Sequence, residues 1–157
     1  MDHLDYEPTT LALDKAKKRT GELSSQVLGL IGIKEGKVTE PGPLLATCDE
    51  DPDHLYKTRH PWSIYNVSSE DVLKKGFQRL REELPEQGWT VVDYGPDTSK
   101  AKTLGLTADK KNERFSVRAE LMVSSPTAGT EKNPRIEVTV VSGCYRAPEG
   151  TDLNQEY

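Results

Sequence analysis

The densest group of side chains that could do chemistry lies in segment 48–62. Three aspartates occupy alternate positions from Asp49 to Asp53, as the first ligands of a calcium-binding loop do. Such a loop needs glycine at its sixth position and a bidentate glutamate at its twelfth, but this chain has His54 and His60 there. We therefore expect a solvated acidic loop and no metal site.

The same two histidines could act as general bases together with an acidic residue of this segment, which would suit a small hydrolase. Their spacing of six residues is poor for two zinc ligands on one helix or strand, and neither cysteine belongs to a Cys-x-x-Cys pair. The chain also lacks the Gly-x-Ser-x-Gly elbow, the phosphate-binding loop and the dinucleotide fingerprint. No cofactor is expected.

Aromatic and cationic side chains in the same region suggest recognition rather than catalysis. Tyrosine, tryptophan and arginine supply most of the binding energy at protein interfaces. The predicted binding residues are Tyr56, Arg59, His60, Trp62 and Tyr65. The alternative is that Trp62 and Trp89 pack beneath helices as ordinary core residues.

The two cysteines, Cys48 and Cys144, each lie beside strand-like sequence and are 96 positions apart (144 − 48). They could form a disulfide, which would close a long loop and would place the protein in an oxidising compartment. They could also be two buried free thiols. The residues alone leave both alternatives open.

Composition excludes some classes of protein. A net charge of −5 argues against general nucleic-acid binding, which needs a basic face. No apolar run approaches the roughly 18 residues of a membrane span. With 157 residues, the chain is long enough for one domain with a real core.

The segment 68–94 predicts a helix followed by a strand. Leu73, Phe77, Leu80 and Leu84 recur at three- and four-residue steps, and Gly88 suits the end of the helix. An earlier helix is predicted from Thr9 or Thr10 to about Ile31, on the same kind of spacing. Extended segments are predicted at 44–48, 61–67, 89–94, 103–107, 114–124 and 135–145, with a polar loop over 49–59.

Strands joined by short turns, each with one polar face, favour an antiparallel sheet. The predicted fold class is α+β, a two-layer sandwich with two amphipathic helices on one face of a mainly antiparallel sheet. The predicted organisation is a flexible N-terminus over 1–8, one domain over 9–147 and a flexible tail over 148–157.

This layout resembles the mature part of small actinobacterial lipoproteins and secreted proteins of unassigned function. The resemblance lies in an early helix, a cysteine-containing short strand, a Trp-Tyr segment, a helix ending in Gly-Trp and a last strand Ile-Glu-Val-Thr-Val-Val-Ser-Gly-Cys-Tyr. It implies an extracytoplasmic location, a Cys48–Cys144 bridge and attachment through a lipidated cysteine upstream of Met1. It implies no catalytic residues.

Three functional hypotheses follow. The first is a non-enzymatic, extracytoplasmic domain that binds a partner protein, an envelope component or a small ligand through the uncovered sheet face or segment 49–65. The second is a small hydrolase using His54 or His60. The third is a cytoplasmic interaction or immunity-type protein, which requires both thiols to be reduced.

Overall fold

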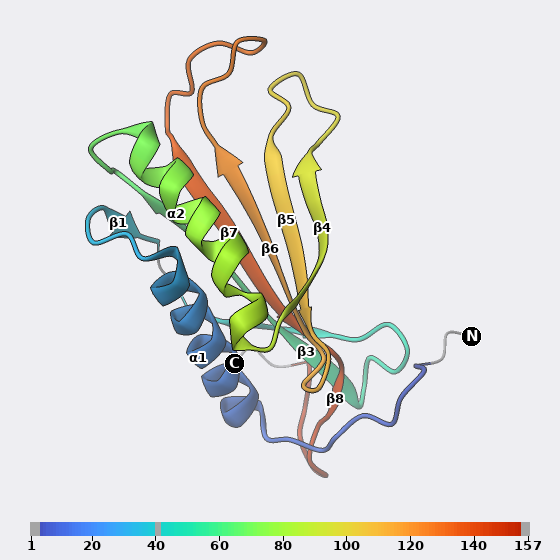
Figure 1. The fold of residues 1–157 in the computed structure, drawn as a ribbon. Helices are drawn as coiled ribbons and strands as arrows, with labels where there is room; N and C mark the ends of the chain where they lie inside the picture. Colours follow the sequence, from blue (N-terminus) through green and yellow to red (C-terminus); the bar gives the residue numbers. More distant parts are fainter. Residues whose placement is uncertain (1–3, 40–41, 155–157) are drawn as a thin grey trace.

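The computed structural model describes residues 4–39 and 42–154 and has a layer of helices on a single sheet. Figure 1 shows both long helices on the same face of the sheet. The elements are α1 (Leu13–Ile31), β1 (Lys37–Val38), β2 (Leu44–Thr47), β3 (Leu55–Tyr65), α2 (Glu70–Glu83), the 3-10 helix η1 (Pro85–Gln87), β4 (Thr90–Pro96), β5 (Leu104–Lys110), β6 (Phe115–Met122), β7 (Arg135–Ser142) and β8 (Tyr145–Arg146). The predicted α+β class is confirmed.

The sheet runs in the order β1-β3-β7-β6-β5-β4, with β2 and β8 also paired to β3. Every pairing between these strands is antiparallel. Strands β6 and β7 alternate strictly between buried and half-buried residues, because successive side chains point to opposite faces. The side chains that face the helices are thus mostly apolar, and those on the open face are mostly polar.

Helix α2 forms where its apolar spacing predicts it. Leu73, Phe77 and Leu80 are buried, and Glu70 and Asp71 place negative charge in the first turn, where the helix dipole favours it. Pro85 cannot continue the helix and starts η1 instead. Gly88 then adopts the left-handed conformation (φ 88°) and the chain turns into β4.

Helix α1 begins at Leu13, later than the predicted start at Thr9 or Thr10. The backbone before it is extended because it is already bonded elsewhere: the Leu11 amide donates to the carbonyl of Arg146, and the Thr9 carbonyl accepts from the Arg146 amide. The helix ends where predicted, with Gly32 in the left-handed region (φ 69°). No described helix is long and apolar enough to cross a membrane.

The predicted polar loop over 49–59 is wrong in its second half. Strand β3 starts at Leu55, so residues 55–59 belong to the sheet and pair with both β2 and β8. The acidic turn is confined to residues 49–54. This correction matters because an extended strand sends alternate side chains to opposite faces.

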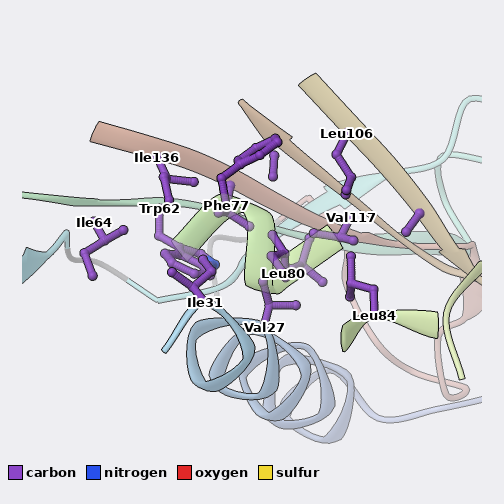
Figure 2. Close-up of a cluster of buried hydrophobic side chains, with 14 of the residues drawn as sticks. Val27, Ile31, Trp62, Ile64, Phe77, Leu80, Leu84, Leu106, Val117 and Ile136 are labelled. Atoms are coloured by element: carbon purple, nitrogen blue, oxygen red, sulfur yellow. The ribbon is translucent and has the colours of Figure 1, made fainter. Parts of the chain in front are cut away.

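The main core lies between the two helices and the sheet (Figure 2). Phe77, Leu80 and Leu84 of the α2 region meet Val27 and Ile31 of α1 over the strands. A second, smaller cluster lies at the start of α1, and residues near the C-terminal end of the described chain pack against it. Its buried members are Leu13, Ala16 and Tyr56, and the half-buried side chains against them are Leu11, Leu45, Tyr145, Ala147 and Leu153.

Candidate functional site

Cys48 and Cys144 form a disulfide, with Cα atoms 6.3 Å apart. The bridge joins the end of β2 to the link between β7 and β8. The predicted bridge is confirmed, and the alternative of two buried free thiols is wrong. We call the surrounding part of the molecule, which contains the bridge, β8 and the β5–β6 turn (residues 111–114), the disulfide end.

The five predicted binding residues do not form one surface. They all lie on β3, whose alternation separates them. Tyr56 and Trp62 face the helices and are only 1% and 5% exposed. His60 shares their side, where its Nδ1 lies 2.7 Å from the Ser24 hydroxyl of α1. Arg59 and Tyr65 point to the opposite face, where their binding role stays a prediction.

Both tryptophans are core residues, as the simpler alternative predicts. Trp89 Nε1 donates to Gln26 Oε1 over 3.0 Å, which satisfies its buried polar group. Trp62 Nε1 is buried without a partner among the described atoms. Neither indole ring can serve as an exposed recognition anchor.

The two histidines that the hydrolase hypothesis needs are far apart. His54 is exposed beside Asp51, with 3.0 Å between its Nδ1 and a carboxylate oxygen. Six residues of extended chain span about 20 Å, so its ring cannot meet that of His60. Within residues 4–39 and 42–154, the one cluster of three potential metal ligands is Cys48, Glu50 and Cys144. Its two sulfur atoms are joined in the disulfide.

Two hollows, each of about 440 Å³, lie side by side at the disulfide end. Both are lined by Tyr6, Arg114 and Gly143, which form the wall between them. The first hollow is also lined by Glu7, Thr9, Leu11, Arg19, Asn112, Glu113, Cys144 and Tyr145. The second is also lined by Asp5, Asp109, Lys111, Phe115, Ser116, Val141 and Ser142.

Tyr6 is held at the centre of this wall by three residues, Arg114, Gly143 and Cys144, which we call the Tyr6 seat. The Cys144 amide donates a hydrogen bond of 2.8 Å to the Tyr6 hydroxyl. The Arg114 guanidinium lies over the ring, with its Cζ 4.0 Å from the centroid, in a cation–π contact. A Cβ on Gly143 would stand 2.9 Å from the hydroxyl oxygen, so the close approach requires glycine.

The segment that carries Tyr6 continues alongside β8, to which it is paired by a single bridge. Thr10 forms an isolated parallel bridge with Arg146, and the Tyr56 hydroxyl donates to the carbonyl of Leu11 over 2.6 Å. The described part of the predicted flexible N-terminus (residues 4–8) therefore contacts the domain. Leu153 of the predicted flexible tail also contacts it, through the second cluster. Residues 1–3 and 155–157 of these two ends lie outside the described residues.

An ion pair borders the first hollow. Arg19 of α1 donates two hydrogen bonds, of 2.7 and 2.5 Å, to the carboxylate of Glu113 in the β5–β6 turn. These bonds hold the pKa of Glu113 below its ordinary value and raise that of Arg19. Burial raises the pKa of the neighbouring Tyr145 hydroxyl. At neutral pH, the hollow thus presents a charged pair and the neutral phenol of Tyr145.

Sequence patterns give little sign of this site. Tyr6 and Cys144 are 138 positions apart, and Arg19 and Glu113 are 94 apart. No local periodicity connects such residues. The one available signal was Gly143 beside a cysteine, since glycine often marks a close backbone approach.

Comparison with protein-family models, curated proteins and solved structures gave no match for the chain. The geometry of the disulfide end therefore carries the functional interpretation by itself.

Proposed function

We propose that this protein is a non-enzymatic binding domain that is either secreted or located in the cell envelope. It binds its ligand or partner at the disulfide end. Attachment through a lipidated cysteine upstream of Met1, which the resemblance implies, stays a prediction. The observation that carries the proposal is a pair of adjoining hollows at the disulfide end, of which the first is lined by Cys144 of the bridge and the second by its neighbour Gly143.

The disulfide supports the location. Bridges of this kind persist in oxidising compartments and are rare in the cytosol. The third hypothesis, a cytoplasmic immunity-type protein, requires two free thiols in place of that bridge.

The lining of the hollows supports binding over catalysis. Ligand sites combine apolar or aromatic walls with a few directed polar groups. Here the walls are the rings of Tyr6, Tyr145 and Phe115, and the polar groups include the guanidinium of Arg114. Among residues 4–39 and 42–154, no histidine lines either hollow, and the sulfur of Cys144 is bridged, so these residues place no nucleophile beside an imidazole base there.

Amide chemical shifts of the isotopically labelled chain test this proposal. A panel of short peptides, soluble glycans and small polar metabolites should contain compounds that shift the amides of Arg114, Gly143 and Cys144. Arg114→Ala should abolish those shifts. Arg81→Ala is a matched control: Arg81 lies over the Tyr94 ring at 4.1 Å and lines neither hollow, so this change should leave the amide shifts as they are in the wild type.

Compounds that shift only amides elsewhere, or that bind Arg114→Ala as well as the wild type, would contradict the proposed site. Turnover of ester or amide substrates that is lost in His54→Ala or His60→Ala would favour the hydrolase hypothesis instead.

A further inference from the structure

The chain's own N-terminal segment (residues 4–12) occupies the disulfide end as a bound peptide would. One side chain, Tyr6, enters the Tyr6 seat and satisfies the backbone amide of Cys144. The segment then adds to the sheet edge through its backbone, with Thr9 and Leu11 both bonded to Arg146 of β8. Edge-strand addition with one anchoring side chain is a general mode of peptide recognition.

The space around Tyr6 is larger than its occupant. Here two hollows of about 440 Å³ flank one phenol ring. The surroundings of the Tyr6 seat are therefore not filled by the segment that occupies it, and a longer or bulkier peptide could use the remaining space.

No residue of the segment is fully buried, although its backbone bonds to Arg146 and accepts from the Tyr56 hydroxyl. Glu7 makes only a 3.7 Å ion pair with Arg146, and its side chain is 89% exposed. Exposed ion pairs contribute little to stability. Segments with few buried contacts open locally at much lower free energy than the whole domain. Release of the segment would break its bonds to Cys144, Arg146 and Tyr56 and would leave the disulfide itself in place.

We propose that the Tyr6 seat and the edge of β8 bind an extended segment of a partner protein that carries a tyrosine followed by an acidic residue, in place of residues 4–12. The tyrosine would take the contacts of Tyr6 with Arg114 and Cys144, and the acidic residue would face Arg146. This inference rests on the proposed binding function and names its ligand class.

A labelled synthetic peptide with the sequence of residues 4–12, Leu-Asp-Tyr-Glu-Pro-Thr-Thr-Leu-Ala, serves as the probe, and its affinity is measured by fluorescence polarisation. In the full-length wild type, the tethered segment competes with it at a high effective concentration. Tyr6→Ala weakens this competitor, so the peptide should bind that variant at least about tenfold more tightly than the wild type. Tyr6→Phe, which keeps the ring and the fold, should bind the peptide with intermediate affinity.

Two controls separate the Tyr6 seat from nonspecific binding. A peptide with alanine in place of its tyrosine should not bind Tyr6→Ala. Adding Arg114→Ala to Tyr6→Ala should abolish binding of the original peptide, whereas adding Arg81→Ala should leave it unchanged.

Equal peptide affinities for wild type, Tyr6→Phe and Tyr6→Ala, or binding that does not need the peptide's tyrosine, would overturn the inference. If the peptide does not bind but other compounds change the amide chemical shifts of Gly143 and Cys144, only the ligand class is wrong. If no compound changes those chemical shifts, the proposed binding function is wrong too. A concentration-dependent dimer of the wild type that the free peptide dissociates would overturn the choice of a partner protein, because two copies would then exchange their N-terminal segments.

Discussion

Removing the disulfide should have the largest effect on stability of any change at the disulfide end. The bridge joins residues 96 positions apart. In the chain-entropy model, closing a loop of that length lowers the entropy of the unfolded chain by about 16 cal/mol/K, equivalent to about 4.7 kcal/mol at 25 °C. A small domain is stable by only about 5–15 kcal/mol in total. Cys48→Ser combined with Cys144→Ser should therefore lose about 3–5 kcal/mol of unfolding free energy.

Urea denaturation followed by tryptophan fluorescence measures this loss, because Trp62 and Trp89 are both buried in the main core. Wild type treated with reductant should match the double serine variant, whereas reductant should not change the variant itself. The effect should also have a local signature: amide hydrogen exchange at Arg146 and Leu11 should rise more than exchange in β6. A loss below about 1 kcal/mol would refute the reasoning, since it would mean that the loop is already restricted in the unfolded chain.

The remaining predictions concern the helices and the ion pair. Gly29→Ala should stabilise the protein by about 0.5–1 kcal/mol, because alanine is the better helix former and, apart from the neighbouring residues and the helix's own backbone, nothing lies within 4 Å of the new Cβ position. Gly76→Ala should instead destabilise it by about 1–3 kcal/mol, because its Cβ would stand 2.8 Å from Ile33 Cδ1; equal effects in urea denaturation would contradict this contrast. Glu113→Gln should cost about 0.5–1 kcal/mol at neutral pH by removing the part-exposed ion pair with Arg19. The folded-state pKa of Glu113 is lowered, so the ion pair stabilises the wild type only while Glu113 is charged. The wild type should therefore lose its stability advantage over the variant as the pH falls below the ordinary pKa of 4.5 and through the folded-state pKa. A stability difference that persists in acid would show that the difference comes from packing.

The spacing of apolar residues predicts those helices and strands whose conformation depends mainly on their own residues. Helix α2 follows from the spacing of Leu73, Phe77 and Leu80, and β6 and β7 follow from strict alternation. The start of β3 does not follow from local pattern, because Leu55 directly follows an acidic turn and the polar residues up to Arg59 predict a loop. Its pairing with β2 and β8 comes from residues distant in the sequence, which no local window contains.

The candidate site was less predictable than the fold. The residue types chosen for recognition, tyrosine, tryptophan and arginine, are those that bind well, but burial removed Tyr56 and Trp62 from the surface. The site that the structure presents uses Tyr6, in a segment without periodic pattern, and Arg114, at the very start of the predicted extended segment 114–124. Tyr6 and Arg114 meet only in the tertiary structure, where both pack closely against the backbone of Gly143.

Whether Cys48 and Cys144 are bridged in the living cell decides both the compartment and the integrity of the disulfide end. The direct measurement is to block free thiols with an alkylating reagent in intact cells, isolate the protein and determine its intact mass without reductant. We expect no alkyl group on the chain and a mass lower by two hydrogens than that of the reduced form. Two alkyl groups on the chain before any reduction would contradict the bridge, the extracytoplasmic location and the site built upon it.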